Sequence, residues 1–308
     1  MKKNSLSVNF CGVKFENPLI LASGFMGISA SSLSYVEKSR AGGVTTKSIG
    51  HLERMGHTSP TVLAWSGNIL NAVGLSNPGI DQSLPILAMM QKKIKVPLII
   101  SFFADTDTNY AKVAQKIVTL KPKLIEVNAS CPNTQDDLGA PFAVDSNALK
   151  ILVRKVRKVV PKSIKMIVKL SPNVPDISIM GKIAESEGAD AICAVNTVPG
   201  MIIDIYARRP VLTNKSGGVS GKAIKPVAVK AVYDLYKAIK IPIIGLGGVE
   251  TGQDALEMIM VGATLVGVGS AIYSRGMKVF KHIQQEMTEI MKDEGIKNLE
   301  SIKGAAHG

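Results

Sequence analysis

LIISFFADTDTNYAKVAQKIVTLKPKLIEVN, residues 98–128, is the stretch that decides the fold. It begins with a short apolar run, Leu98–Ser101, continues into an amphipathic segment, Thr108–Leu120, and ends in a second apolar run, Leu124–Asn128. Near-continuous apolar runs that alternate with amphipathic segments are typical of parallel strands covered by helices on both faces. The stretch therefore predicts a strand–helix–strand unit.

The same pattern recurs along the chain of 308 residues. Apolar runs that predict strands occur eight times: Leu19–Ala22, Val44–Lys47, Leu98–Ser101, Leu124–Asn128, Met166–Leu170, Ala191–Asn196, Ile243–Leu246 and Leu265–Gly269. Helix-like segments between them include Ser32–Arg40, Thr108–Leu120, Asn147–Val159, Ile177–Glu187, Pro226–Ile239 and Gln253–Val261. Eight such units at this length predict an α/β fold, a (β/α)8 TIM barrel, and a doubly wound open sheet is the competing architecture. We expect one domain, residues 1–308, because no linker or low-complexity segment interrupts the pattern.

Three connections, those after the second, fourth and sixth strands, are longer than an ordinary crossover. Paired runs that predict hairpins occur in the first and the third: Thr61–Leu63 with Ile69–Val73, and Ile203–Tyr206 with Val211–Thr213. In a barrel these insertions follow strand C-termini, so we expect them on the face that carries catalytic sites. At the N-terminus, alternating apolar residues in 6–15 around Cys11-Gly12 predict a hairpin that plugs the opposite end.

The formal net charge is +13, an excess that can indicate nucleic acid or an anionic ligand. The composition weakens the first reading, because the chain has 30 Lys and only 7 Arg, and Arg is the side chain that binds bases and phosphates through two bonds. Aromatic residues, at 5%, are few for stacking bases. A basic nucleic-acid-binding protein stays as the non-enzyme alternative.

Three cysteines, Cys11, Cys131 and Cys193, are widely separated, and no CxxC motif occurs. We therefore expect no zinc site and no iron–sulfur cluster held by this chain, and a reducing, cytoplasmic setting. No apolar run approaches the roughly 18 residues that a membrane helix needs, so we expect no membrane association.

Polar residues and glycines stand where the predicted strands end. Lys47 and Lys169 each end an apolar run, where burying an ammonium group without an anionic partner is costly, so we expect both to contact an anion or a cofactor. The last two strands run into Gly245-Leu246-Gly247-Gly248 and Gly267-Val268-Gly269-Ser270. Because the loops after strands seven and eight of such barrels often bind phosphate, these glycines predict a phosphate site. Neither is a GxGxxG motif, which argues against a Rossmann dinucleotide site.

Asn128-Ala129-Ser130-Cys131-Pro132-Asn133 is the most specific feature. Cys131 lies among polar, turn-forming residues rather than in an apolar run, and a nearby lysine can make a thiol, with its ordinary pKa of about 8.5, a usable base. Carboxamides that can both donate and accept hydrogen bonds are expected at one mouth: Asn71, Asn128, Asn133 and Asn196. Such a set suits a neutral ring with imide groups, such as a pyrimidine.

At these residues the chain resembles the class 1 dihydroorotate dehydrogenases, which oxidise dihydroorotate to orotate in pyrimidine synthesis. The matching segments run through nearly the whole chain: Asn17–Gly24, Lys47-Ser48, Asn71–Pro78, Asn128–Asn133, Val168–Asn173, Asn196-Thr197, Asn214–Gly218, Ser220-Gly221 and Gly245–Val249. The resemblance implies a barrel that holds one FMN and no metal.

Site residues follow from the resemblance by position. FMN would be contacted by Ser23, Lys47, Ser48, Ser101, Asn128, Lys169, Val195, Gly221, Gly247, Gly248, Gly269 and Ser270. Substrate would be held by Lys47, Asn71, Gly74, Leu75, Asn128, Asn133, Asn196 and Thr197, and Cys131 matches the family's catalytic base. Two residues depart from the pattern: Ser101 stands where these proteins often have an Asn that touches the flavin, and Ala129 replaces a larger aliphatic residue.

Within the family, the segments Asn214–Gly218 and Gly221–Pro226 look most like subclass 1B. That subclass implies a partner subunit that carries FAD and a 2Fe–2S cluster and reduces NAD⁺, with a homodimer core inside a heterotetramer. A dihydropyrimidine dehydrogenase module is the alternative enzyme, since those barrels share the flavin site and the catalytic Cys. Lys47 argues for the first, because a cation near the ring is useful when the substrate carries a carboxylate.

Overall fold

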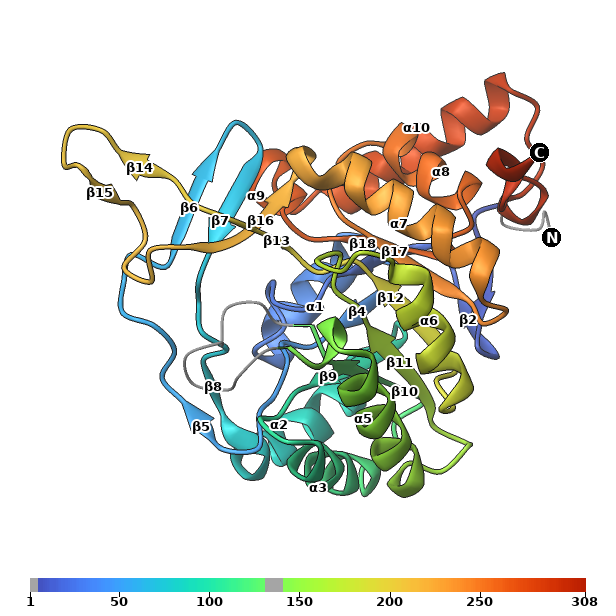
Figure 1. The fold of residues 1–308 in the computed structure, drawn as a ribbon. Helices are drawn as coiled ribbons and strands as arrows, with labels where there is room; N and C mark the ends of the chain where they lie inside the picture. Colours follow the sequence, from blue (N-terminus) through green and yellow to red (C-terminus); the bar gives the residue numbers. More distant parts are fainter. Residues whose placement is uncertain (1–4, 131–140) are drawn as a thin grey trace.

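A closed barrel of eight parallel strands forms the centre of the computed structural model, which describes residues 5–130 and 141–308 (Figure 1). The barrel strands in chain order are β3 (Leu19–Leu21), β4 (Gly43–Thr45), β9 (Leu98–Phe102), β10 (Leu124–Asn128), β11 (Lys165–Lys169), β12 (Ala191–Ala194), β17 (Ile243–Leu246) and β18 (Leu265–Val268). Each pairs with its neighbours in this order, and β18 pairs with β3 to close the ring. The predicted TIM barrel is confirmed, and the open sheet is excluded.

Helices surround the barrel, as the sequence pattern predicts (Figure 1). The described α-helices are α1 (Ala30–Lys38), α2 (Gly79–Lys93), α3 (Asp107–Val118), α5 (Ser146–Val159), α6 (Ile177–Ser186), α7 (Lys225–Ala238), α8 (Gly252–Met260), α9 (Ala271–Arg275) and α10 (Val279–Asp293). Short 3-10 helices are η1 (Phe142–Val144), η2 (Lys222–Ile224), η3 (Leu299–Ser301) and η4 (Ala305–His307). Across residues 5–130 and 141–308, no helix combines the length and apolarity that crossing a membrane requires.

The barrel interior has a lower half, at the N-terminal ends of the strands, and an upper half, at their C-terminal ends. The lower half is apolar and is plugged by the N-terminal hairpin. Strands β1 (Val8–Phe10) and β2 (Val13–Phe15) pair antiparallel, as predicted. Phe10 and Phe15 are fully buried with their ring planes at 88°, and they pack against inward side chains of the barrel strands: Ile20, Ile99, Leu124, Ile167, Ile244 and Leu265. Because side chains alternate along a strand, the residues two positions further on, such as Glu126 and Lys169, point into the upper interior.

The insertions after the second and sixth barrel strands join in one antiparallel sheet. Its order is β13 (Val198–Gly200), β16 (Gly217–Gly221), β7 (Asn68–Asn71) and β6 (Val62–Trp65). The hairpin predicted in the first insertion is therefore confirmed as β6–β7, and β16 ties it to the sixth connection. A smaller pair, β5 (Glu53–Arg54) with β8 (Asn77–Pro78), lies in the same insertion.

The hairpin in the sixth connection differs from the prediction. Its strands are β14 (Ile203–Asp204) and β15 (Arg209–Pro210), so the second strand expected at Val211–Thr213 is wrong. The Asp204 carboxylate accepts hydrogen bonds from the amides of Tyr206 and Ala207. This tight turn sets Arg209 opposite Asp204, and beyond β15 one further backbone bond, from the Val211 amide to the Ile202 carbonyl, joins the two arms.

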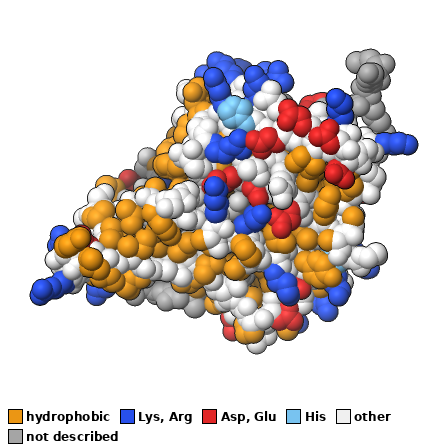
Figure 2. Space-filling view, turned by 90° about the horizontal axis from the view of Figure 1, so that it is seen from above, with side chains coloured by type: hydrophobic (Ala, Val, Ile, Leu, Met, Phe, Trp, Pro, Cys, Tyr) orange, Lys and Arg blue, Asp and Glu red, His pale blue; other side chains and the backbone are white. Residues whose placement is uncertain are grey.

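An exposed apolar surface covers the part of the molecule that carries this hairpin (Figure 2). Large hydrophobic side chains that are about half exposed or more occur there: Val62, Met201, Ile203, Ile205 and Tyr206. The most exposed of them is Tyr206, at 92%. A contiguous apolar surface of this kind is typical of a region that contacts another protein.

Replacing Phe15 with Ala tests the plug. The change removes a fully buried ring that contacts Phe10, so we expect the free energy of unfolding to fall by about 3–5 kcal/mol. Urea unfolding followed by circular dichroism measures it, with Lys14→Ala on the same strand as the control. Lys14 is exposed, so its loss should change stability by about 0.5 kcal/mol or less. Equal effects of the two changes would contradict the buried plug.

Candidate active site

Two adjoining cavities open at the C-terminal ends of the barrel strands, beneath the β13–β16–β7–β6 sheet. Their volumes are about 210 Å³ and about 70 Å³. They are continuous, since both are lined by Ser23, Phe25, Lys169, Asn196, Thr197 and Ser220. We call the first the amide cavity and the second the glycine cavity, after the residues described below.

The structure brings the residues proposed from the sequence to these two cavities. The amide cavity is lined by Ser23, Lys47, Ser48, Asn71, Gly74, Leu75, Asn128, Lys169, Asn196 and Thr197. The glycine cavity adds Val195, Gly221, Gly247, Gly248, Gly269 and Ser270. Cys131 and Asn133 lie outside the described residues. Ser101 lines neither cavity: it is fully buried, and its hydroxyl lies one hydrogen bond behind Ser48. Any effect of Ser101 on a ligand is therefore indirect in this geometry.

Hydrogen bonds hold the floor of the amide cavity. The Asn128 amide nitrogen donates to Ser48 Oγ at 3.0 Å, and Ser48 Oγ lies 2.8 Å from Ser101 Oγ. Ser23 Oγ donates to the Thr46 carbonyl at 2.9 Å. Each floor side chain is thus held by neighbours on other strands, which gives a ligand a pre-formed surface.

A second group of bonds anchors the segment that leads to Cys131. Asn196 Nδ2 donates to the carbonyl and the hydroxyl of Ser130, at 3.1 and 3.0 Å, and Ser130 is fully buried. The Tyr110 hydroxyl donates to the Asn128 carbonyl at 2.7 Å. The last described residues before position 131 are therefore fixed to the cavity wall.

Two lysines give the amide cavity positive charge. Lys169, only 5% exposed, ends β11, and Lys47 follows β4. Burial lowers the pKa of Lys47 from its ordinary value. No Asp or Glu is among the described residues that line either cavity. Because a buried ammonium group needs an electron-rich partner, this charge favours an anionic or carbonyl-bearing ligand.

In the glycine cavity, several lining residues are glycines, where the backbone packs too closely for a side chain. Gly221 and Gly248 have positive φ angles of 99° and 72°. A Cβ on Gly248 would lie 2.8 Å from the Gly221 carbonyl oxygen, and a Cβ on Gly269 would lie 2.7 Å from the Phe25 ring. A side chain at these positions would collide with neighbouring protein atoms, so backbone lines this part of the cavity. This is the surface that a phosphate group requires.

Among the lining residues that were not assigned a role from the sequence are Ser220, Phe25 and Tyr273. Ser220 lies on β16, and its buried hydroxyl has no hydrogen-bond partner in the described parts of the chain. Phe25 and Tyr273 meet edge to face with ring centroids 6.0 Å apart, and Tyr273 is 65% exposed at the rim. The one sequence signal for Phe25 and Tyr273 is that they follow the strand-end segments Ser23-Gly24 and Gly269-Ser270. An aromatic residue after a strand has no recognisable pattern of its own.

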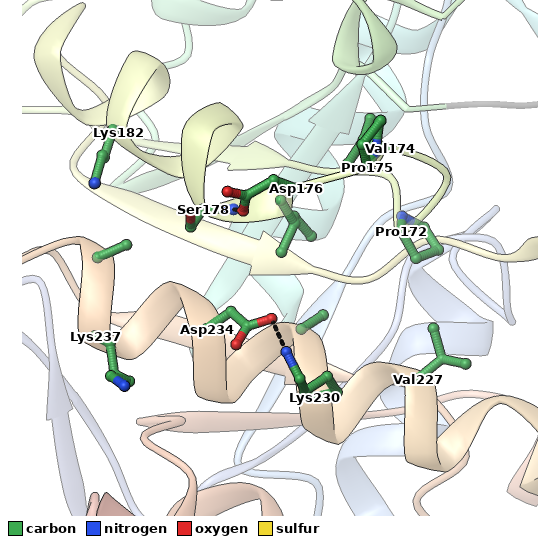
Figure 3. Close-up of a pocket in the computed structure, with 13 residues that line it drawn as sticks. Pro172, Val174, Pro175, Asp176, Ser178, Lys182, Val227, Lys230, Asp234 and Lys237 are labelled. Carbon is green, nitrogen blue, oxygen red and sulfur yellow. Dashed lines mark hydrogen bonds and ion pairs between the residues drawn. The ribbon is translucent and has the colours of Figure 1, made fainter.

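A larger groove, of about 670 Å³, lies on the outside of the barrel between α6 and α7 (Figure 3). Its acidic residues already have partners: Asp234 pairs with Lys230, and Asp176 accepts from the Ser178 amide at the start of α6. None of the residues proposed from the sequence lines it. The groove is therefore separate from the candidate active site.

Comparison with known proteins agrees with this geometry. The dihydroorotate dehydrogenase family model matches residues 5–291. The chain is 43% identical over 307 residues to a protein of Methanosarcina mazei named dihydroorotate dehydrogenase B (NAD(+)), catalytic subunit, covering 99% of this chain and 96% of that protein. A Pyrococcus horikoshii protein with the same name is 41% identical and is covered over 99% of both chains.

The fold also matches a solved structure, that of Eimeria tenella DHODH in complex with ferulenol. The TM-score is 0.85, with 99% of this chain and 89% of the other covered, at 23% identity. At that identity the structural match supports the barrel fold alone. The family is shown by the family model and by the full-length relatives. The chain belongs to the dihydroorotate dehydrogenase family.

Proposed function

We propose that this chain catalyses the FMN-dependent oxidation of (S)-dihydroorotate to orotate, a step of de novo pyrimidine synthesis. The observation that carries the proposal is the joining of two cavities of different chemistry at one barrel mouth. One has lysines and carboxamides, and the other is lined by the glycines Gly221, Gly247, Gly248 and Gly269. A flavin mononucleotide, with a ring that carries carbonyl and imide groups at one end and a phosphate at the other, spans two such surfaces.

The residues present fit FMN. Ser220 offers a buried hydroxyl without a described partner, and a ligand at the junction of the cavities would satisfy it. Gly221, Gly248 and Gly269 line the glycine cavity, where a phosphate could lie against their backbone. Lys169 would meet the carbonyl edge of the ring. When bound, FMN supplies a two-electron acceptor that no side chain provides.

The substrate would lie in the amide cavity. Lys47 supplies a cation for the orotate carboxylate, which separates this reading from a dihydropyrimidine dehydrogenase acting on a ring without a carboxylate. Asn71, Asn128 and Asn196 line the same cavity and would pair with the ring's imide groups, joined by Asn133 and the Gly74-Leu75 turn. The polar groups thus fix the ring's orientation before reaction.

Cys131 would remove the proton from C5 as the hydride leaves C6. Described structure stops one residue before it, at Ser130, which Asn196 and Asn128 hold at the cavity wall. This anchoring supports the proposal because a base must be presented at a defined position beside the substrate.

For electron transfer onward, we propose a partner subunit that carries FAD and a 2Fe–2S cluster and reduces NAD⁺, with a homodimer of this chain at the core. The support is the subunit name of the relatives and the exposed apolar surface at Ile203, Ile205 and Tyr206. A reducing, cytoplasmic setting fits the free thiols of Cys11 and Cys193.

Anaerobic reduction by dihydroorotate tests the proposal. The purified chain should be yellow, release FMN on denaturation, and lose its flavin absorbance when dihydroorotate is added. Dihydrouracil, which lacks the carboxylate, is the matched control and should leave the absorbance unchanged. A colourless protein, or bleaching by dihydrouracil alone, would overturn the assignment.

Replacing Cys131 with Ala should slow flavin reduction by about 10²–10⁴-fold, which is the usual contribution of a positioned general base. FMN and orotate should still bind, because neither is held by the thiol. Cys131→Ser should also be slow near neutral pH and recover partly at high pH, since a hydroxyl is a weaker acid than a thiol. Stopped-flow absorbance measures the rate, and a Cys131→Ala rate within a few-fold of the unmodified protein would assign the proton transfer to another group.

Replacing Lys47 with Ala should weaken orotate binding by about ten- to hundredfold, from the loss of a charged hydrogen bond of roughly 1.5–3 kcal/mol. Because burial lowers the pKa of Lys47, this lysine loses its proton at a lower pH than an ordinary lysine does. Orotate affinity of the unmodified protein should therefore fall as the pH rises through that pKa.

The Lys47 variant should lack this alkaline loss of affinity. Orotate titration followed by flavin absorbance, after a check of FMN content, measures both effects. Lys182→Ala, in the groove between α6 and α7, is the control and should bind as the unmodified protein does. Unchanged affinity in the FMN-loaded Lys47 variant would remove Lys47 from the substrate site.

A further inference from the structure

A buried carboxylate lies inside the barrel directly beneath the amide cavity. Glu126 is only 3% exposed, in the middle of β10, and shares the inward face of that strand with Leu124 below and Asn128 above. Among the described residues, no Lys or Arg forms an ion pair with it. It lines neither cavity, so the proposed reaction gives it no direct contact with a ligand.

Neutral donors compensate the carboxylate instead. The Ser101 hydroxyl donates to Glu126 Oε1 at 2.8 Å, and the pair are direct cross-strand neighbours on β9 and β10. The Cys193 thiol lies against the same carboxylate, and its pKa is raised by burial and by the nearby negative charge. Both neighbours carry a proton that a Glu126 oxygen can accept, and the Ser101 hydroxyl donates to Oε1.

This acceptor sets the direction of a chain of hydrogen bonds that reaches the cavity. Because Ser101 has one proton and gives it to Glu126, the 2.8 Å contact with Ser48 must be a donation from Ser48 to Ser101. Ser48 has then no proton left, so it can only accept from the Asn128 amide, at 3.0 Å. The Asn128 nitrogen is thereby fixed towards Ser48.

The same direction continues on the other side of Asn128. Its oxygen, Oδ1, accepts from the Ser130 hydroxyl at 3.3 Å, and Ser130 Oγ accepts from Asn196 Nδ2 at 3.0 Å. Every proton in the series Asn196, Ser130, Asn128, Ser48, Ser101 and Glu126 points towards the carboxylate. The Asn128 amide thus has its donor and acceptor ends assigned by a group that it does not touch, whereas Asn196 is held by backbone: its Nδ2 donates to the Ser130 carbonyl and its Oδ1 accepts from the Thr197 amide.

We propose that Glu126 is a positioning residue that fixes the orientation of the Asn128 amide for recognition of the pyrimidine ring. A turned carboxamide would present an acceptor where the ring needs a donor. The geometric part of the inference stands on the hydrogen bonds alone, and the part about ring recognition rests on the proposed function.

Removing the Glu126 carboxyl group should allow the series of hydrogen bonds to reverse its direction. In Glu126→Leu, Ser101 has only Ser48 left as an acceptor, and the Ser48 proton becomes available to Ser23 or to Asn128. Neutron diffraction from deuterium-exchanged crystals distinguishes the amide nitrogen from the oxygen. In the unmodified protein the Asn128 nitrogen should face Ser48, and in Glu126→Leu the amide should be reversed or mixed. One unchanged orientation in both proteins would overturn the inference.

Orotate titration of the FMN-loaded proteins gives the second readout. Affinity should fall about tenfold or more in Glu126→Leu, the worth of one mispaired hydrogen bond. Glu126→Gln should recover most of the loss, because its carbonyl oxygen can still accept from Ser101. Equal losses in the Leu and Gln variants would contradict the positioning role.

Ser101→Ala breaks the same link without changing Glu126, so the inference does not depend on one variant folding. It should weaken orotate binding as Glu126→Leu does, and the double variant should be no weaker than either single variant, because both act through one chain. Ser83→Ala is the matched control: Ser83 is a buried serine bonded to the Gly79 carbonyl in α2, and its loss should leave affinity unchanged. Additive losses in the double variant would contradict the shared chain.

The two proposals can fail separately. If Asn128 turns in the Glu126 variant but the unmodified protein binds no orotate, the proposed function fails and the positioning role of Glu126 stands. If the unmodified protein binds orotate and all three variants bind it equally well, the positioning role fails and the proposed function stands.

Discussion

The structure depends on one constraint, which is that the same barrel interior must be apolar at one end and polar at the other. The lower end excludes water because Phe10 and Phe15 plug it against inward Ile and Leu side chains. Two residues further along the strands the interior carries Ser101, Glu126 and Lys169 instead. Polar groups can be buried there only because they satisfy one another, as Ser101 and Glu126 do, or because a ligand completes them.

The apolar lower layer and the polar upper layer of the barrel together hold the side chains of the cavity floor in fixed positions. Asn128 ends β10 and Ser48 lies just after β4, and their hydrogen bond holds both side chains in place. The sheet above the mouth adds residues from distant parts of the chain: Asn71 on β7 donates to the Gly218 carbonyl on β16. Ligand contacts therefore rest on strands that the apolar lower barrel keeps in register.

Much of this arrangement was predictable from the sequence because it follows from local pattern. The barrel strands are apolar runs, and in a parallel barrel all their C-termini meet at one mouth, so Lys47, Lys169 and Asn128 could be placed together without a structure. The glycines at 247, 248 and 269 were recognisable because two glycine-rich turns followed successive strands.

Other features escaped prediction for physical reasons. Strand β16, Gly217–Gly221, is glycine-rich and has no strand pattern; its glycines are required by close packing against β7, where a Cβ on Gly217 would lie 2.5 Å from the Asn71 carbonyl oxygen. Helix α2 contains Pro85, a residue type that usually ends helices. Glu126 was read as part of an apolar run, although its spacing of two from Asn128 puts it on the same inward face. The direction of a hydrogen-bond chain has no signal in sequence at all.

The central claim is that one ligand-binding mouth, built from the two cavities, holds both the cofactor and the substrate. A crystal structure of the protein with FMN and orotate tests this claim most directly. The account predicts the FMN phosphate against the backbone of Gly247, Gly248 and Gly269, the flavin ring beside Lys169 and Ser220, and the orotate carboxylate at Lys47. Flavin or orotate density elsewhere, for example in the groove between α6 and α7, with the barrel mouth holding neither, would contradict it.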